Sequence, residues 1–397
     1  MKKIILTDAN TYATLSVARS LARKGFEIIV GGERATDMSF YSKSVAKKFI
    51  YTSPKKSIER FLKDIKKAID NYSPDMLIPV ADKTLIVISE HRADLKAKTF
   101  LAQDKHIKTA MNKFETQKLA QSLGIKTPKT IFLNNDQWQS NLLQNAGINF
   151  PVAIKACCSA DIIGDRVIGG SNTIYSNSEE ELLSKLKVFQ TRLHKLLVQE
   201  FIAGTIIGIS GIFKNGNPIA LFAYKRIRQT RPIGGPSALA ESIALNDTLK
   251  TQALPLMRAL EWSGPAMLEF KTGKDGEIYL LEINGRFWGS LPLSIFSGVD
   301  MPFLYFKSVN DMPVDSSETF YKVGLKGRFF WGDLLNLFLR LRGIPKWWPD
   351  ISLSRIEALR DFFASFFDEK LVYLDFQSDD IVPFLIRPLS IFNELLF

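Results

Sequence analysis

Residues 278–286 read Ile278-Tyr-Leu-Leu-Glu282-Ile-Asn284-Gly-Arg286, which sets polar groups inside an otherwise apolar strand. Glu282 and Asn284 are two positions apart, so in a strand they share one face. A carboxylate in an apolar run is costly to bury unless a cation or a metal ion neutralises it. This strand is therefore the first candidate for a functional site.

A second apolar strand precedes it, Pro265-Ala-Met-Leu-Glu269-Phe-Lys271, and it also carries one acid. Gly-Lys-Asp-Gly at 273–276 predicts a hairpin turn between the two strands. Glu269 and Glu282 can then lie on neighbouring strands and face the same side. Together with the Asn284 carboxamide they form a hard oxygen site suited to Mg²⁺, completed by phosphate oxygens and water. The alternative is a pair of strand acids neutralised by Lys or Arg.

Two lysines stand where they could meet phosphate oxygens. Lys155 ends the apolar strand Pro151-Val-Ala-Ile-Lys155, and Lys113 lies in a helix predicted over residues 108–123. A lysine at the end of a buried strand is an effective point charge for phosphate. The alternative for each is a surface residue with a buried aliphatic stem.

The segment Leu197-Val-Gln199-Glu200-Phe201-Ile202-Ala-Gly204 is an apolar strand running into a polar, bendable stretch. Such a hinge can present backbone groups to the edge of an adenine ring. Residues 224–237 then carry four cations and a glycine-rich turn, and we expect three arginines there to bind a substrate carboxylate and a γ-phosphate. Those arginines are Arg226, Arg228 and Arg231. The alternative is a solvated basic loop or a nucleic-acid patch, although the sparse aromatic residues disfavour single-stranded RNA.

Taken in order, Lys113, Lys155, the hinge at 199–204, Glu269 and the Glu282-x-Asn284-x-Arg286 strand resemble the ATP-grasp superfamily. The resemblance is to its carboxylate–amine ligase branch, which includes biotin carboxylase, carbamoyl-phosphate synthetase and D-alanine–D-alanine ligase. It covers roughly residues 1–310. It implies ATP and Mg²⁺ as cofactors, with Mn²⁺ as an alternative ion, and an acyl phosphate that an amine converts to an amide.

The resemblance also implies a role for each matched residue. Lys113 and Lys155 would contact the ATP phosphates, and the hinge would hold adenine through Gln199, Glu200, Phe201 and Ile202. Glu269, Glu282 and Asn284 would hold the metal, and Arg286 would steady the transferred phosphoryl group.

One stretch departs from the family pattern. The family usually places a glycine-rich loop over the phosphates, but residues 159–170 contain few glycines and two acids, Asp161 and Asp165. Arg166 is a candidate substitute for the missing backbone contacts. Gly285 stands where many relatives have proline, which we expect to be tolerated.

The N-terminal third predicts a parallel βαβ unit, with strands at 4–6, 27–30 and 76–80 separated by amphipathic helices. The turn after the first strand, residues 8–13, has no glycine, so a dinucleotide-binding site is not expected there. The fold class expected is α/β and α+β: a Rossmann-like domain over residues 1–110, a two-lobed ATP-grasp domain and an aromatic-rich C-terminal extension. The lobes are expected at 111–195 and 196–310, and the extension at 311–397.

The composition limits which classes of protein this chain can belong to. The chain has 397 residues, 46% of them hydrophobic, and a net charge of +11, all of it in residues 1–320. The two cysteines are adjacent, which rules out a disulfide framework and suits a reducing, cytoplasmic setting. The aromatic residues of the extension indicate packing or a homodimer face rather than peripheral membrane contact, because residues 321–397 carry no net charge.

The leading hypothesis is thus an ATP-dependent ligase acting on a small carboxylate and an amine. A non-catalytic ATP-binding scaffold is the second hypothesis, and binding of RNA or a large anion, unlikely on this sequence, is the third. The sequence names neither the acid nor the amine.

Overall fold

The N-terminal part of the protein is a four-stranded parallel sheet with helices packed around it, in a computed structural model that describes residues 1–134, 142–170, 173–190, 195–348 and 354–388. The strand order is β3-β2-β1-β4, and Ile4, Ile5 and Leu6 of β1 are fully buried because neighbouring segments cover both faces of the sheet. The elements are β1 (Lys3–Leu6), α1 (Tyr12–Arg23), β2 (Glu27–Gly32), η1 (Met38–Tyr41), β3 (Lys47–Ile50), α2 (Ile58–Tyr72), β4 (Met76–Ile78), α3 (Asp82–Glu90) and η2 (Arg92–Asp94).

The helix predicted over 108–123 is two helices, α4 (Asp104–Met111) and α5 (Lys113–Ser122). Asn112 adopts an extended conformation between them, and its side chain accepts hydrogen bonds from the first backbone N–H groups of α5. The prediction of one continuous helix was wrong because the capping side chain competes with helix continuation there.

The next unit is a small antiparallel sheet in the order β5-β10-β6-β9, packed on α6 and α7. It therefore extends through Glu200, whereas the sequence prediction placed the lobe boundary at residue 195. The elements are β5 (Thr130–Asn134), α6 (Leu142–Asn145), β6 (Val152–Ala156), the hairpin β7 (Asp161–Ile163) and β8 (Arg166–Ile168), β9 (Ile174–Ser176), α7 (Glu179–Gln190) and β10 (Lys195–Glu200).

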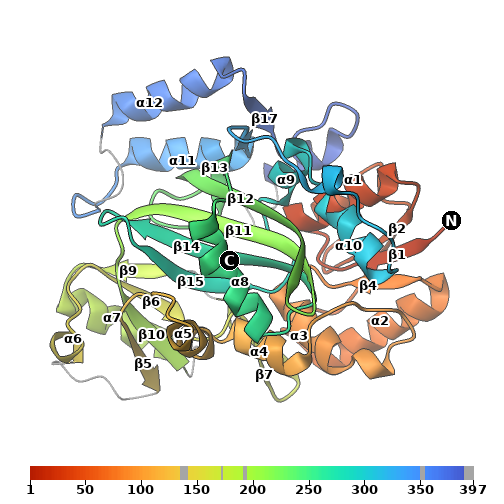
Figure 1. The fold of residues 1–397 in the computed structure, drawn as a ribbon, viewed down its shortest axis with the longest axis horizontal. Coiled ribbons are helices and arrows are strands. Elements are labelled where there is room, and N and C mark those ends of the chain that lie inside the picture. Colours follow the sequence, from red (N-terminus) through yellow and green to blue (C-terminus); the bar gives the residue numbers. More distant parts are fainter. Residues whose placement is uncertain (135–141, 171–172, 191–194, 349–353, 389–397) are drawn as a thin grey trace.

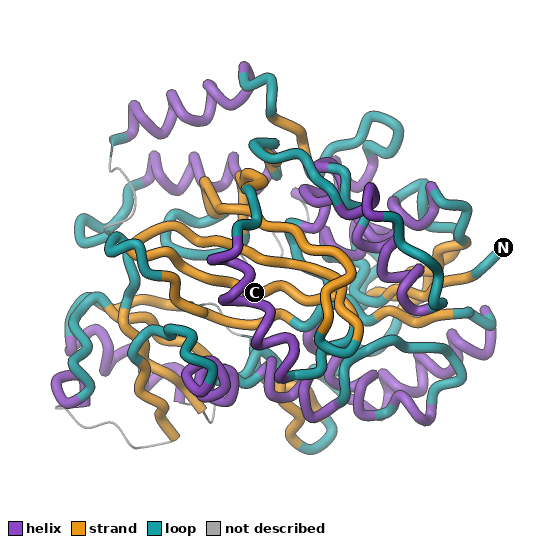
Figure 2. The backbone as a smooth tube through the Cα atoms, viewed as in Figure 1, coloured by secondary structure: helices purple, strands orange, loops and turns teal. Residues whose placement is uncertain are grey.

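A seven-stranded sheet occupies the middle of the molecule, in the order β15-β14-β11-β12-β13-β16-β17 (Figures 1 and 2). One face packs on α8, and the other packs on α9, α10 and the N-terminal sheet. Its elements are β11 (Gly204–Lys214), β12 (Asn217–Gln229), β13 (Ser237–Ile243), α8 (Asp247–Ala259), β14 (Gly264–Gly273), β15 (Ile278–Asn284), α9 (Leu291–Ser297), α10 (Met301–Val309), η3 (Ser316–Thr319) and β16 (Lys326–Arg328).

The C-terminal extension is built into this sheet. Its strand β17 pairs with β16 in parallel, and α11 packs against β12 and β13 (Figure 1). Packing was one of the two roles expected for this segment, and the structure shows it. The elements are α11 (Phe330–Arg342), α12 (Arg355–Ala364), η4 (Ser365–Phe367) and β17 (Leu371–Tyr373).

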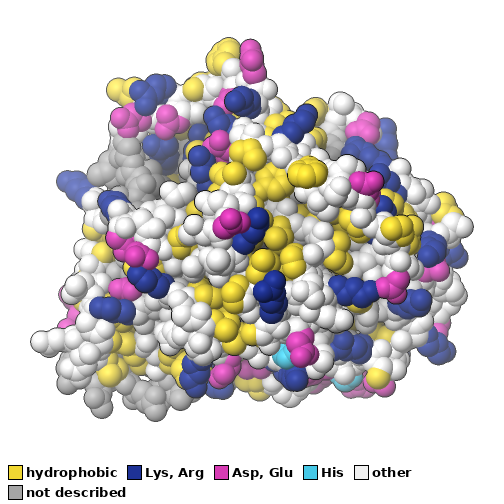
Figure 3. All heavy atoms as spheres, viewed as in Figure 1, with side chains coloured by type: hydrophobic (Ala, Val, Ile, Leu, Met, Phe, Trp, Pro, Cys, Tyr) yellow, Lys and Arg dark blue, Asp and Glu magenta, His cyan; other side chains and the backbone are white. Residues whose placement is uncertain are grey.

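The expected N-terminal parallel unit, two-lobed second part and aromatic-rich extension are therefore confirmed. Figure 3 shows Lys and Arg side chains spread among acidic ones on the face it draws, rather than gathered in one basic stripe. In the described part of the chain, no helix is both long and apolar enough to cross a membrane.

Candidate active site

The two strand acids face each other as the hairpin predicted. In the register of β14 and β15, Glu269 lies directly opposite Glu282, and Met267 lies opposite Asn284. Asn284 Nδ2 donates to Glu282 Oε1 at 3.1 Å. Three oxygen-bearing side chains thus share one face of the sheet, on the side away from α8.

Cations from the small lobe reach this face. Lys113 Nζ lies 3.6 Å from Glu282 Oε2 and donates to Ser159 Oγ at 3.3 Å. Lys113 is the first residue of α5, and its backbone N–H bonds the carbonyl of Cys157 next to β6. The break at Asn112 therefore fixes the position of Lys113. Lys155 Nζ donates to Gln199 Oε1 at 2.8 Å across the β6–β10 pair.

The two acids differ in their pKa values because their cation neighbours differ. Burial alone would raise the pKa of Glu282, but the charges of Lys113 and Lys155 and the Asn284 hydrogen bond outweigh burial and lower it to about 2. Burial raises the pKa of Glu269, with Arg226 opposing. Burial also lowers the pKa of Lys155 to about 8. Glu282 is thus ionised at neutral pH, the state that a metal-binding carboxylate needs.

The predicted hinge joins the two sheets. Gln199 is buried and donates from Nε2 to Thr130 Oγ1, and Glu200 Oε1 accepts the Lys129 N–H at 2.7 Å. The Phe201 ring lies 4.4 Å from Lys271 Nζ. Ile202 follows as partly buried coil before β11.

Three aromatic rings contact one another at this hinge. The Phe201 and Trp348 ring centroids are 4.9 Å apart, and Tyr175 of β9 contacts both rings. Trp348 comes from the C-terminal extension, so that extension contacts the small lobe as well as the large sheet. The density of aromatic residues in the extension is visible in the sequence, but their position beside the hinge is not.

The three arginines of the basic segment separate. Residues 224–229 belong to β12, and Arg226 extends over β11 to pair with Glu269. Arg228 is held by Asp333 of α11, with Nε–Oδ1 at 2.6 Å and Nη2–Oδ2 at 2.8 Å. Arg231 is exposed in the turn after β12. The structure therefore brings only Arg226 of these three to the metal-ligand candidates.

Arg286 links the site to the N-terminal sheet. Its Nη2 donates to Asn284 Oδ1 at 3.1 Å and to Asp82 Oδ2 at 3.0 Å. Asp82 begins α3 just after β4, and Asp8 follows the neighbouring strand β1. Sequence reasoning missed both acids, although each stands at the carboxyl end of a parallel strand, where ligand sites of open sheets lie.

Residues 159–170, the stretch that departs from the family pattern, contain the β7–β8 hairpin. This hairpin contacts the N-terminal domain. Asp165 accepts from Ser57 Oγ at 2.6 Å and from the Glu59 N–H at 2.8 Å, so it caps the start of α2. Asp161 accepts from the next backbone N–H. Arg166 is exposed at the hairpin tip. Both carboxylates thus accept hydrogen bonds, Asp165 from the N-terminal domain and Asp161 from its own neighbour.

The adjacent cysteines are free, and Cys157 is buried with its Sγ 3.4 Å from Asn112 Oδ1. Cys157 thus packs in the interior beside the residue that caps α5. In the ranges the structure describes, no three His, Cys, Asp or Glu side chains form a metal site by themselves. A metal at Glu269, Glu282 and Asn284 would therefore depend on phosphate oxygens and water to complete its coordination.

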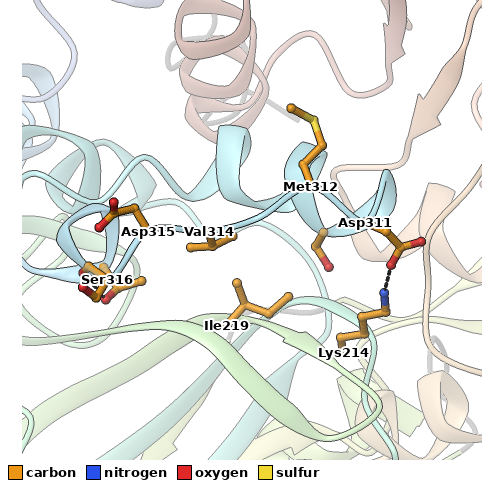
Figure 4. Close-up of a pocket in the computed structure, with 9 residues that line it drawn as sticks. Lys214, Ile219, Asp311, Met312, Val314, Asp315 and Ser316 are labelled. Atoms are coloured by element: carbon orange, nitrogen blue, oxygen red, sulfur yellow. Dashed lines mark hydrogen bonds and ion pairs between the residues drawn. The ribbon is translucent and has the colours of Figure 1, made fainter.

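A cavity of about 500 Å³ lies apart from these residues, between the β11–β12 hairpin and the segment after α10. Lys214 pairs with Asp311 at its rim (Figure 4). None of the predicted site residues lines it. We assign it no part in the site.

Comparison with known proteins supports the architecture. Residues 192–326 match the family described as ATP-grasp in the biosynthetic pathway with Ter operon. The chain carries an ATP-grasp domain. The match includes the hinge and both strands that bear Glu269 and Glu282.

Solved structures share the fold over most of the chain. The ADP complex of PurK, an N5-carboxyaminoimidazole ribonucleotide synthetase, superposes with a TM-score of 0.64 at 12% identity, covering 91% of this chain and 96% of that one. The biotin carboxylase domain of a Hydrogenobacter thermophilus 2-oxoglutarate carboxylase, in complex with MgADP, ADP and bicarbonate, gives 0.63 at 14% identity, covering 82% and 73%.

Among curated proteins, the chain is 27% identical over 195 residues to a coenzyme gamma-F420-2:alpha-L-glutamate ligase of Methanococcus maripaludis. That match covers 45% of this chain and 59% of the relative. The superfamily resemblance is thus confirmed, while reaction and substrates remain matters of proposal.

Proposed function

We propose that the protein is an ATP- and Mg²⁺-dependent ligase that activates a carboxylate as an acyl phosphate and joins it to an amine. One observation carries the proposal. Two lysines of the small lobe and two strands of the large lobe that bear oxygen ligands meet on one face of the large sheet. Lys113 and Lys155 come from the small lobe, and Glu269, Glu282 and Asn284 from the large one. Phosphoryl transfer depends on such positioning and charge neutralisation more than on a protein nucleophile.

ATP would lie between the lobes. Lys113 and Lys155 would meet its phosphates, and the hinge from Gln199 to Ile202 would meet adenine, with Glu200 using its backbone carbonyl. The printed descriptions of both structural neighbours include ADP, and one includes MgADP. Those descriptions support this assignment.

The donor set fits Mg²⁺. Glu269, Glu282 and Asn284 offer only hard oxygen ligands, and Glu282 is ionised far below neutral pH. Bound Mg²⁺ would neutralise the phosphate charge as the β–γ bridge breaks. Mn²⁺ has the same ligand preference and would substitute.

Ligation would follow in two balanced steps. A carboxylate oxygen of the substrate forms a bond to the γ-phosphorus while the bond from that phosphorus to ADP breaks. The amine nitrogen then forms a bond to the carbonyl carbon, phosphate leaves, and the nitrogen loses a proton. Arg286 would steady the transferred group, and Arg226 would orient the substrate carboxylate. The curated relative is itself described as a glutamate ligase, which agrees with amide formation.

The N-terminal sheet would bind the amine substrate. Its carboxyl edge meets Arg286 through Asp82, and Asp8 and Glu33 there share the single lysine Lys83. That excess of carboxylate suits a cationic amine and offers a proton acceptor.

The first test is ATP binding by calorimetry, with and without Mg²⁺, on wild type and Glu282→Ala. The proposal expects Mg²⁺ to strengthen binding to wild type and to have no such effect on the variant. ADP release with pools of acids and amines then separates a ligase from a non-catalytic ATP-binding scaffold. Absence of binding at millimolar ATP would exclude both. The substrates would be small molecules. Location in the cytoplasm and a homodimer remain part of the proposal, and the carboxylase-domain neighbour is described as a dimer.

A further inference from the structure

The hydroxyl of Tyr224 is a buried donor that is matched with a poor acceptor. Tyr224 is 1% exposed, and its hydroxyl donates to the Met267 thioether sulfur at 3.0 Å. A buried phenol usually finds an oxygen or nitrogen partner, because a thioether accepts hydrogen bonds only weakly. A buried polar group that the folded chain satisfies poorly is a candidate for contact with a ligand.

The strand order places this hydroxyl beside the metal-ligand candidates. Tyr224 of β12 stands opposite Gly208 of β11, which in turn stands opposite Glu269 of β14. A Cβ atom on Gly208 would lie 2.7 Å from the Tyr224 oxygen and would also clash with the ring, so glycine lets the ring lie across β11. The hydroxyl thereby reaches Met267, which precedes Glu269 by two positions on the same face of β14. Met267 also stands opposite Asn284.

The direction of β14 relates this hydroxyl to the nucleotide. Gly273, at the carboxyl end of β14, stands opposite Gly204, which directly follows the hinge. Glu269 lies farther from the hinge along the strand, and Met267 lies farther still. With adenine at the hinge and Mg²⁺ at Glu269, the triphosphate would extend toward Met267. The γ-phosphoryl group is then the part of ATP that comes nearest to the Tyr224 hydroxyl.

The neighbours of the hydroxyl suit an anion. Arg226, two positions after Tyr224 on β12, lies beside the hydroxyl and pairs with Glu269, and Ser290 at the start of α9 adds a second hydroxyl. A guanidinium has no acceptor atoms, so Arg226 leaves the phenol proton available. Burial raises the pKa of Tyr224, and the Arg226 charge only partly opposes burial, so the phenol is protonated at neutral pH. A neutral donor next to a cation matches the several oxygens of a phosphoryl group.

We infer that Tyr224 is a further catalytic residue, whose hydroxyl turns from Met267 to donate a hydrogen bond to the γ-phosphoryl group of ATP. The inference rests on the proposed function, because it takes adenine to lie at the hinge and the metal at Glu269. Tyr224 keeps its proton throughout, and no bond to it forms or breaks. Its contribution is to stabilise the negative charge on the phosphoryl oxygens while that group moves from ADP to the substrate carboxylate.

The test compares ADP with an ATP analogue whose γ-phosphoryl group cannot be transferred. Calorimetry on the full chain with Mg²⁺ measures the dissociation constant of each nucleotide. Tyr224→Phe should weaken binding of the analogue about tenfold, the effect of one hydrogen bond to a charged group, and should leave ADP binding unchanged. Equal affinity of variant and wild type for the analogue would overturn the inference.

Two further variants separate phosphoryl recognition from a structural role. Met267→Leu removes the thioether and keeps a similar apolar volume, so it should bind the analogue at least as tightly as wild type. If the Tyr224–Met267 bond served only the fold, Tyr224→Phe and Met267→Leu would lose affinity in parallel. Tyr305→Phe is the matched control, because Tyr305 is also fully buried and its hydroxyl donates to the Phe100 carbonyl at 2.7 Å. Its ratio of the two dissociation constants should equal that of wild type. Parallel losses in the first two variants, or the same loss in the control, would reject the role of Tyr224.

Failure of the underlying ligase proposal would look different. In that case ADP release would be absent with every acid and amine, while the weaker analogue binding of Tyr224→Phe would still be seen. If ADP release occurred and Tyr224→Phe bound the analogue as wild type does, the ligase proposal would stand and the role of Tyr224 would fall. Absence of ADP binding to wild type would overturn both.

Discussion

Arg226 on β12 and Glu269 on β14 form an ion pair across the intervening strand β11. Gly208 of β11 stands in register with Glu269 on one side and Tyr224 on the other. Because Gly208 has no side chain, the Tyr224 ring can lie over it on this face of the sheet. A candidate metal ligand is thus neutralised by a candidate substrate-binding group, and metal at Glu269 would leave Arg226 available to a substrate carboxylate.

Replacement of Arg226 by glutamine should separate nucleotide binding from ligation. Glu269 would lose its cation, so Mg²⁺-dependent ATP binding should persist or become tighter. The turnover of acid and amine should fall about a hundredfold or more, the usual effect of removing one charge-stabilising donor. Calorimetry and ADP release measure the two effects. Lys225→Gln, next along the strand and paired with Glu241 instead, is the control. Loss of ATP binding in Arg226→Gln would contradict this division of roles.

The lowered pKa of Lys155 predicts how the affinity for ATP changes with pH. Burial lowers its pKa to about 8, with Glu282 partly opposing. Above that pH the free protein loses this positive charge, and bound phosphates would restore the proton. The dissociation constant for Mg·ATP should therefore rise with pH, by up to about tenfold between pH 8 and 9.

Two measurements check this linkage. Calorimetry in buffers of different ionisation enthalpy should show proton uptake on ATP binding above pH 8. Lys155→Arg, whose guanidinium stays protonated, should flatten the pH profile. A wild-type dissociation constant that is constant from pH 7 to pH 9 would show that Lys155 does not face the phosphates.

The β7–β8 hairpin should open to solvent more often when the Asp165 side chain is removed. Asp165 accepts two hydrogen bonds at the start of α2, and the Val167 N–H donates to the Pro54 carbonyl at 2.9 Å. Asp165→Ala removes the first two contacts, so backbone amides of residues 161–168 should exchange faster with solvent. The Michaelis constant for ATP should rise if this hairpin covers the phosphates. Asp161→Ala is the matched control, because its carboxylate accepts a hydrogen bond from its own neighbour, Ile162. Unchanged exchange in Asp165→Ala would show that the side chain does not hold the hairpin.

The hairpin of metal-ligand candidates could be predicted because its signal is local. Glu269 and Glu282 stand in two apolar strands joined by a short turn, which makes a paired hairpin predictable. A register shift between Glu269 and Phe270, which the sequence did not reveal, brings the two acids opposite each other. The partition of the arginines could not be predicted, since Arg228 meets Asp333 across 105 positions of sequence. The buried polar residues of α11 were equally hidden, because Asp333 and Asn336 meet Arg228 and Gln229, which lie 105 and 107 positions earlier in the chain. Long-range charge pairing, rather than periodicity, decided both.

The C-terminal extension also holds the N-terminal domain, through a buried ion pair. Arg19 of α1 donates from Nε to Asp380 Oδ2 at 2.8 Å, and its Nη2 donates to the Asp380 carbonyl at 2.8 Å. Ser42 Oγ and the Lys43 N–H donate to the same carboxylate. Burial alone would raise the pKa of Asp380, but these donors and the Arg19 charge outweigh burial and lower it.

Asp380→Ala should therefore lower the free energy of unfolding by about 3 kcal/mol, because it leaves the Arg19 guanidinium buried without its counter-charge. The stabilisation by Asp380 should be present above the ordinary carboxyl pKa and should be lost as the pH falls through the lowered value, since the unfolded chain takes up the proton first. Urea unfolding at neutral and acidic pH measures both effects. Asp379→Ala should leave the midpoint unchanged, because that side chain is 71% exposed and lies 3.5 Å from Arg23 at the surface. Equal unfolding midpoints for Asp380→Ala and wild type would show that the extension does not depend on this contact.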